Sequence, residues 1–310
     1  MKVLKRFFVV FIILSIFILT SCTQAEAEDN GKLKIVATLF PQYDFARQIA
    51  GDKADVVLLL PPGVESHSFD PKPADMLEIY NADIFIYTGK DMEPWAETVL
   101  KGVTNDNLVV VDCSEQGELL SHDDDDDDEG HDHEHGEDPH IWLDPYRAMQ
   151  MACNIGNALY EKDRENGDYY TKNLSDYIER LEKLHDDISD AITNAKRSVI
   201  VFGGRFSYIY FLHRYELDYV TAYDSCSVNA EPSVLRIAEI IDFIKENNIP
   251  CIFHEELSDP KVAKSIASET GIEYLLFSTA HNITKDEFDS GITFLDIMYA
   301  NLENLKKGLN

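Results

Sequence analysis

A tract rich in acidic side chains and histidines stands in the middle of this sequence. Eleven Asp and Glu residues lie from Ser121 to Asp138, and four histidines are interspersed among them: His122, His131, His133 and His135. Imidazole nitrogen suits zinc, and the carboxylates raise the local concentration of cations. We therefore expect the tract to collect metal ions weakly; the alternative is a solvated segment that serves only solubility. Such a tract rarely holds an ion in fixed geometry, so an ordered site is expected elsewhere.

Three loops outside the tract each contain a histidine that is a candidate ligand. His67 lies in the loop 61–73, which prolines restrict, so little ordering is needed on binding. His140 follows the tract directly and stands two residues before Trp142, while His281 lies in a polar loop after the last predicted strand. The competing interpretation of each is an ordinary loop or packing histidine.

A carboxylate ligand is expected from one of two adjacent glutamates, Glu255 and Glu256, which follow a strand that ends at Phe253. Side chains alternate along extended backbone, so only one of the pair should face the cleft. We choose Glu256, with Glu255 as the rival; capping of the next helix is the alternative role for either. The predicted metal ligands are thus His67, His140, Glu256 and His281.

Three imidazoles and one carboxylate form a tetrahedral shell that favours Zn²⁺ over Mn²⁺, since manganese prefers more oxygen ligands. A closed shell of four ligands stores or carries an ion, whereas catalysis needs an open position for water. Neutral imidazoles are required, so we expect binding to weaken as the pH falls through the histidine range.

Short β-branched apolar runs alternate with helical stretches along the chain, which is typical of parallel sheets covered by helices on both faces. The predicted strands span 33–39, 56–60, 83–87 and 108–112 in the first half, and 198–202, 218–222, 250–253 and 273–277 in the second. The fold class is therefore α/β, with two similar lobes that each contain a four-stranded, mainly parallel sheet. Ligands bind such folds outside the carboxyl ends of the strands.

A long helical region, 145–194, separates the two predicted sheets and is broken near 166–167. Its second part has apolar residues in steps of three and four from Tyr170 to Ile192. About 28 residues at ~1.5 Å each give a rod of roughly 40 Å, long enough to traverse both lobes. We expect this helix to join the lobes and resist hinge opening, and a final helix, 291–309, to pack back on them.

The N-terminus has the pattern of an export signal, in which basic residues precede the apolar run 7–19. The segment Leu19-Thr20-Ser21-Cys22 resembles the bacterial lipoprotein processing site, where Cys22 would be acylated. An ordinary secretory peptide or a short membrane helix is the alternative, although the run is too short to span a bilayer comfortably. The predicted divisions are a signal peptide (1–21), a tether (22–31), an N-terminal lobe that includes the tract 121–138 (32–144), a helical segment (145–196) and a C-terminal lobe (197–310).

The formal net charge is −30, and removal of the signal takes three positive and no negative charges, which leaves −33. Phosphate would repel so acidic a chain, so we expect no nucleic-acid partner. The cysteines other than Cys22 lack the close paired spacing of a zinc–thiolate site. Disulfides and buried free thiols both remain open for them. They are Cys113, Cys153, Cys226 and Cys251.

Several motifs follow one another along the mature chain. They are Pro62-Gly63 through His67 to Pro73, Glu93-Pro94-Trp95, the acidic histidine tract, Asp138-Pro139-His140-Ile141-Trp142-Leu143-Asp144-Pro145 and Tyr299-Ala300-Asn301-Leu302. Together they resemble the metal-binding lipoprotein component of zinc/manganese ABC importers, of the zinc type with a His-rich acidic loop. The resemblance implies two α/β lobes joined by one long helix, with ligands at His67 and His140.

One position departs from that family pattern. Many relatives carry a third histidine just after the first strand of the second lobe, where this chain has none between 201 and 208. Relatives usually have an acid where His281 stands. We therefore expect His281, in the loop after the last predicted strand, to supply the imidazole that is missing between 201 and 208. Arg205 cannot ligate a cation, and we expect it to pair with an acid or to face away.

The resemblance implies a monomeric, extracytoplasmic protein that is lipid-anchored to the bacterial cell membrane. It would capture Zn²⁺ between its lobes and deliver it to an ABC permease and its ATPase, without catalysis. The alternatives are a manganese-binding importer component and a metal-dependent surface adhesin. A metallohydrolase is less favoured, because the sequence has neither a His-Glu-x-x-His helix nor a nucleophile elbow.

Overall fold

The computed structural model describes residues 31–115, 119–120, 137–223, 226–227 and 231–310. Cys22 and the tract histidines His122, His131, His133 and His135 lie outside the described residues, as does the predicted signal peptide. Residues 33–310 form one compact unit, to which the following description applies. The predicted divisions into signal, tether, lobes and helical segment stay predictions.

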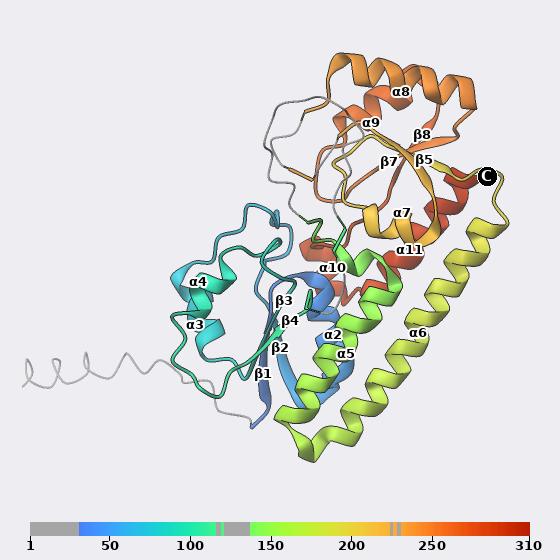
Figure 1. Ribbon diagram of the computed structural model, residues 1–310. Coiled ribbons are helices and arrows are strands. Elements are labelled where there is room, and N and C mark those ends of the chain that lie inside the picture. Colours follow the sequence, from blue (N-terminus) through green and yellow to red (C-terminus); the bar gives the residue numbers. More distant parts are fainter. Residues whose placement is uncertain (1–30, 116–118, 121–136, 224–225, 228–230) are drawn as a thin grey trace, which may run out of the picture. The chain divides into compact units, whose positions relative to one another are not determined.

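Two four-stranded, all-parallel sheets form the framework of this unit (Figure 1). The first contains β1 (Leu33–Ala37), β2 (Ala54–Leu58), β3 (Ile84–Tyr87) and β4 (Val109–Asp112), in the order β2-β1-β3-β4. The second contains β5 (Val199–Phe202), β6 (Asp218–Thr221), β7 (Cys251–His254) and β8 (Glu273–Leu276), in the order β6-β5-β7-β8. The predicted α/β class and its eight strands are confirmed. In such an order the crevice for a ligand opens where the connections diverge, at the carboxyl ends of the strands.

Helices cover both faces of each sheet, because apolar side chains alternate between the faces along every strand. On one face of the first sheet, Val36 and Phe85 pack against α3 (Pro73–Tyr80) and α4 (Ala96–Leu100). The opposite face packs against α2 (Phe40–Ala50) and α5 (Pro145–Lys162). The second sheet is covered by α8 (Val234–Asn247) and α9 (Lys261–Thr270) on one face and by α7 (Ile209–Tyr215) and α11 (Phe294–Leu309) on the other.

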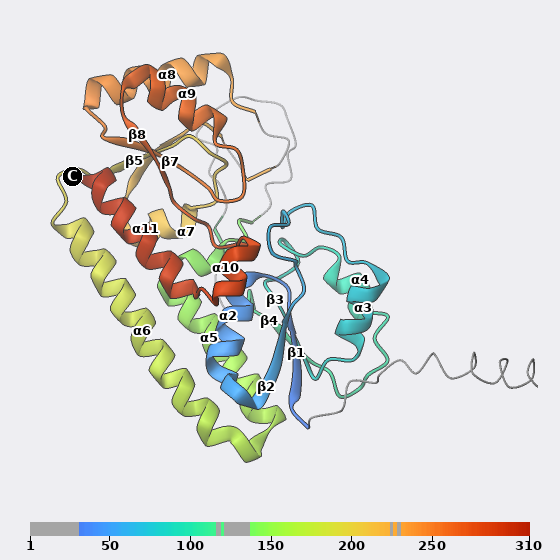
Figure 2. The same ribbon diagram turned by 180° about the vertical axis from the view of Figure 1, so that it is seen from behind.

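The predicted long helix is α6 (Gly167–Thr193), which has 27 residues and packs on α5, α2 and α11 (Figures 1 and 2). It begins where predicted, after the short 3₁₀ turn η3 (Arg164–Asn166) that separates it from α5. Its buried side chains form the expected apolar stripe: Tyr170, Tyr177, Leu181, Leu184 and Ile188. None of the helices in the described ranges combines the length and the apolar character needed to cross a bilayer.

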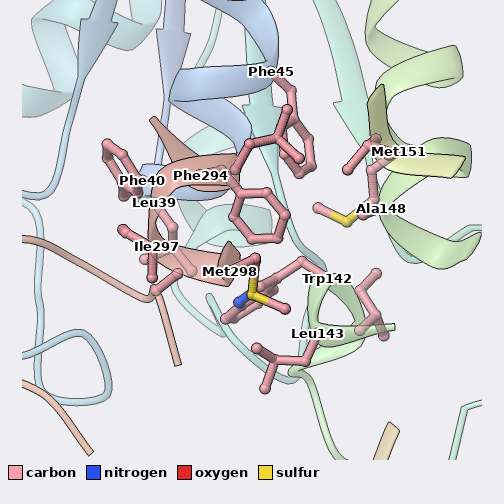
Figure 3. Close-up of a cluster of buried hydrophobic side chains, with 14 of the residues drawn as sticks. Leu39, Phe40, Phe45, Trp142, Leu143, Ala148, Met151, Phe294, Ile297 and Met298 are labelled. Atoms are coloured by element: carbon pink, nitrogen blue, oxygen red, sulfur yellow. The ribbon is translucent and has the colours of Figure 1, made fainter. Parts of the chain in front are cut away.

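One hydrophobic cluster extends beneath both sheets, from Ile35 in β1 to Phe202 in β5. Figure 3 shows the part of it in which α11 packs against α2 and α5. The rings of Phe45 and Phe294 meet edge to face there, with centroids 5.1 Å apart. The Phe294 amide also donates to Asp44 Oδ2 at 2.8 Å. The two sheets therefore share a core.

Candidate metal centre

His67, His140 and His281 come together at the carboxyl ends of the strands, and each offers one nitrogen to a group whose members lie within 4.8 Å of one another. His67 lies in the loop between β2 and α3, and His281 in the loop between β8 and α10 (Lys285–Ser290). His140 directly precedes the 3₁₀ turn η2 (Ile141–Leu143). The Nε2 atoms of His67 and His140 are 3.4 Å apart. Two ligands about 2.0–2.1 Å from a zinc ion lie roughly 3.4 Å apart at the tetrahedral angle, so this spacing suits a shared ion.

His140 is fully buried and is held in place by Asp138. Its backbone amide donates to Asp138 Oδ1 at 2.8 Å, and its Nδ1 donates to the same oxygen at 2.7 Å. This pairing fixes the ring orientation and turns Nε2 toward His67, as carboxylates do behind metal-binding histidines. Burial lowers the pKa of His140, but the charge and hydrogen bond of Asp138 outweigh it and raise the pKa to about 10.

The hydrogen bonds around His281 determine which of its nitrogens is free. The Thr279 hydroxyl has one hydrogen, which it donates to Glu256 Oε1 at 2.6 Å. The short contact between Thr279 Oγ1 and His281 Nδ1 is therefore one in which Nδ1 donates. Nε2 then carries the lone pair, and this buried atom has no hydrogen-bond partner among the described residues. Burial and the neighbouring His140 lower the pKa of His281 to about 4, so its ring is neutral at pH 7.

The loop that carries His281 is bonded to the loop that carries His67. The Asn282 side-chain amide donates to the carbonyls of Pro61 at 2.7 Å and Val64 at 2.9 Å. From the other side, Trp142 Nε1 donates to the Thr279 carbonyl at 2.7 Å. Both indole and amide are buried, so these bonds are shielded from water. The relative positions of the three histidines are thus set by direct contacts between chain segments far apart in sequence.

A cavity of about 70 Å³ opens beside the histidines, and a charged network forms part of its wall. The amide of Arg205 donates to Glu255 at 3.1 Å and its Nε at 3.3 Å, while its Nη1 lies 3.7 Å from Glu65. The expected pairing of Arg205 with an acid is confirmed, so its charge is balanced near the metal group. Gly204 is required for this arrangement, since a Cβ there would lie 1.7 Å from Glu255 Oε2.

Glu255 and Glu256 both line the cavity, so the expectation that only one faces it is wrong. Alternation does not apply to them because β7 ends at His254. Neither carboxylate belongs to the three-nitrogen group. Glu256 accepts from the amide and hydroxyl of Thr279, and its Oε1 lies 3.8 Å from Nδ1 of His281, behind that ring. Its role as a direct ligand stays a prediction.

Cys226 is a residue of the site that the sequence analysis missed. Its Sγ lies 4.0 Å from His67 Nδ1, and its side chain lines the cavity. Burial raises the pKa of this thiol, but the contacts with His140 and His67 outweigh it and lower the pKa to about 6. The open question of disulfides is answered in the described part of the chain, where all four cysteines are free: Cys113, Cys153, Cys226 and Cys251.

The chain is similar to proteins of zinc uptake. The family model described as ZnuA, zinc-uptake complex component A, periplasmic, matches residues 35–308. The high-affinity zinc uptake system protein ZnuA of Bacillus subtilis is 35% identical over 98% of this chain and 98% of its own length. The zinc-binding lipoprotein AdcA of Streptococcus pneumoniae strain R6 is 31% identical over 93% of this chain, which covers 58% of AdcA.

The fold is also that of a solved structure with zinc bound. The Zn(II)-bound ZnuA-like domain of Streptococcus pneumoniae AdcA has a TM-score of 0.75 at 29% identity. The match covers 90% of this chain and 99% of that domain.

Proposed function

This chain belongs to the family of the zinc-uptake complex component A, and on that premise we propose that it is the zinc-binding component of an ABC importer. It binds Zn²⁺ outside the cytoplasm and delivers the ion to a membrane permease. The observation that carries this proposal is the convergence of three imidazole nitrogens within 4.8 Å. The family is one of solute-binding proteins for zinc transport and not of enzymes.

We assign the zinc ligands to His67, His140 and His281, and the positioning of two of their rings to Asp138 and Glu256. Asp138 acts through Nδ1 of His140, and Glu256 acts through Thr279 on Nδ1 of His281. Partners of this kind set the tautomer and basicity of a metal-binding imidazole. The ion is the cargo, so a site that holds it without an open water position suits the function.

The proposed attachment and partners follow from the sequence and from one relative's name. Acylation of Cys22 would anchor the chain in the membrane, and the AdcA relative is named a lipoprotein. We propose a monomer that docks on a permease coupled to an ATPase. Detection of a lipid-modified Cys22 by mass spectrometry of the membrane fraction tests the anchor, and an unmodified signal sequence contradicts it.

The acidic histidine tract is proposed to collect zinc for the ordered site. The two ends of the tract meet, because the Asp138 amide donates to the Leu120 carbonyl at 2.8 Å. The Tyr210 hydroxyl accepts from the Leu120 amide at 3.0 Å and donates to the Asp138 carbonyl at 2.7 Å. The tract thus ends two residues from His140. Deleting 121–136 should lower the number of weakly bound ions and spare the tight one; an unchanged number contradicts the role.

Metal analysis of the purified mature chain tests the function. Elemental analysis gives zinc per chain, and competition with a chromophoric chelator gives the affinity. Wild type should retain one tight zinc, and His67→Ala should lose it. His213→Ala is the matched control, since His213 is exposed on α7. A wild type without tight zinc, or a His67→Ala variant that keeps the wild-type affinity, overturns the proposal.

A further inference from the structure

Three imidazoles leave a tetrahedral zinc shell one donor short, and the acids of the cavity wall are already engaged. Glu255 accepts from Arg205 and from the Ser258 hydroxyl at 2.8 Å. Glu65 accepts from the Ser68 amide at 2.9 Å. Both oxygens of Glu256 accept from Thr279, on the Nδ1 side of His281. If Glu255 or Glu256 moved to the ion, donors in this partly buried site would lose their acceptors, which costs free energy.

Cys226 is differently placed, because its contacts in the site are the imidazoles themselves. Its Sγ lies 4.0 Å from Nδ1 of His67. An independent observation points to a missing ligand at the same place, since Nε2 of His281 is buried without a hydrogen-bond partner in the described chain, and this side chain lines the cavity with Cys226. His281 as a whole is only 9% exposed. Sγ of Cys226 lies outside the group of three nitrogens, as the carboxylates do, but Cys226 lines the same cavity as His281. Imidazole nitrogen and thiolate sulfur are both ordinary zinc ligands.

We propose that Cys226 is the fourth zinc ligand, which completes a shell of three imidazoles and one thiolate. The inference rests on the proposed function and names the donor that closes its site. In a tetrahedral shell with a zinc–sulfur bond of about 2.3 Å, sulfur and nitrogen lie roughly 3.6 Å apart. Sγ is now beside Nδ1 of His67, whereas Nε2 of that ring faces His140. Sulfur must therefore shift toward the three nitrogens when the shell closes.

The chemistry is coordination without redox change. The thiolate lone pair forms the bond to the cation, and a sulfur that is still protonated first releases its proton to solvent. A thiolate suits soft and borderline cations, so the site should select zinc, cobalt and cadmium against manganese. This thiol takes the place that an oxygen ligand holds in the shell predicted from sequence.

Cobalt substitution tests the assignment, because Co²⁺ takes the tetrahedral site and a thiolate ligand gives it a near-ultraviolet charge-transfer band. The metal-free mature chain is titrated with Co²⁺ alone and then with Zn²⁺ in competition with a chelator. Wild type should show the band, and Cys226→Ser should lose it while keeping the visible bands of histidine-bound cobalt. Its zinc affinity should fall by at least about 100-fold, because loss of an outer-shell partner alone costs up to that factor.

Cys153→Ser is the matched control, because Cys153 is a free cysteine on α5 that does not line the cavity; it should keep both band and affinity. A wild type that binds Co²⁺ and Zn²⁺ tightly without the band, or a Cys226→Ser variant with unchanged zinc affinity, overturns the inference and spares the proposed function. A wild type that binds no zinc overturns both.

Discussion

In His140 and His281, the group that contacts Nδ1 influences whether the ring is charged at pH 7. Asp138 holds Nδ1 of His140, whereas a neutral hydroxyl stands at Nδ1 of His281. The two buried rings therefore differ in charge at pH 7, with pKa values of about 10 for His140 and about 4 for His281. Of these two rings, only His140 must lose a proton before zinc can bind.

This difference predicts a pH dependence of zinc affinity. Because zinc displaces one proton from His140, the apparent affinity should rise about tenfold per pH unit from pH 7 to pH 9. Asp138→Asn removes the charge that raises the pKa of His140. The zinc affinity of this variant should therefore rise less steeply with pH than that of wild type. Chelator competition at several pH values measures both slopes. Equal slopes in the two proteins contradict the assignment of the proton to His140.

Glu93 predicts a second pH effect, on folding. Burial raises the pKa of this carboxyl to about 7, despite hydrogen bonds from Thr38 and from the amides of Thr88 and Gly89. The folded state thus binds the proton more tightly than the unfolded state, where the pKa is 4.5. Stability from this group is present below pH 4.5 and is lost as the pH rises through about 7.

The metal-free Glu93→Gln variant should lack that loss. Relative to wild type, it should become more stable between pH 5 and pH 8, by roughly 3 kcal/mol at most. Denaturant unfolding of both proteins at pH 5 and pH 8 gives the difference in their free energies of unfolding. The contributions of the other titrating groups cancel in this difference. Parallel stability profiles of the two proteins would falsify this prediction.

The sequence predicted which histidines meet but not every side chain around them. His67, His140 and His281 stood out because each follows a predicted strand or the tract, and the loops at one edge of such a fold converge. Cys226 could not be found in this way. It has no cysteine partner at close spacing, and only the fold brings Cys226, which stands between β6 and α8 in the sequence, against His67.

At the scale of elements, short β-branched apolar runs between helical stretches identified all eight strands, because helices cover both faces of each sheet. The ends of the strands were less predictable, since the last apolar residues of a run often continue into a loop. Leu59 and Leu60 show this, because both are buried beyond the end of β2 at Leu58. The prediction that only one of Glu255 and Glu256 faces the cavity was wrong for a related reason, because both residues lie beyond the end of β7 at His254.

The hydrogen bonds of Asn282 connect the loop that carries His281 to the loop that carries His67. Asn282→Ala would leave the carbonyls of Pro61 and Val64 without their donor and free the His67 loop from the His281 loop. We expect roughly 1–3 kcal/mol of lost stability and a zinc affinity about 10- to 100-fold weaker. Unfolding and chelator competition measure the two effects.

Asn304→Ala is the control for that prediction. Its side chain also donates to a backbone carbonyl, that of Leu276, but this hydrogen bond is exposed and Asn304 belongs to α11. This variant should keep its zinc affinity. If Asn282→Ala binds zinc as wild type does, the contact between the loops does not position the ligands.

For the whole molecule, the shared core matters more than the division into two sheets. Phe294 is 1% exposed and packs on Phe45, so its side chain links α11 to α2. Phe294→Ala should cost about 3–5 kcal/mol. Since one cluster lies beneath both sheets, unfolding should remain a single transition with a lower midpoint.

Fluorescence and circular dichroism should report the same unfolding midpoint for Phe294→Ala. Leu77→Ala, at a position 58% exposed on α3, should leave the midpoint nearly unchanged. Two separate transitions, only one of them shifted, would show that each sheet unfolds alone.

The placement of Trp142 gives the chain an optical signal of its own. The sequence has two tryptophans, and Trp142 is buried with its ring centroid 5.3 Å from that of His281 and 5.5 Å from that of His140. A charged imidazole accepts an electron from an excited indole, whereas a metal-bound neutral one does so less readily. Emission from this indole should therefore increase when the cation binds. In a Trp95→Phe variant, Trp142 is the one remaining tryptophan, so its fluorescence reports metal binding without an added dye.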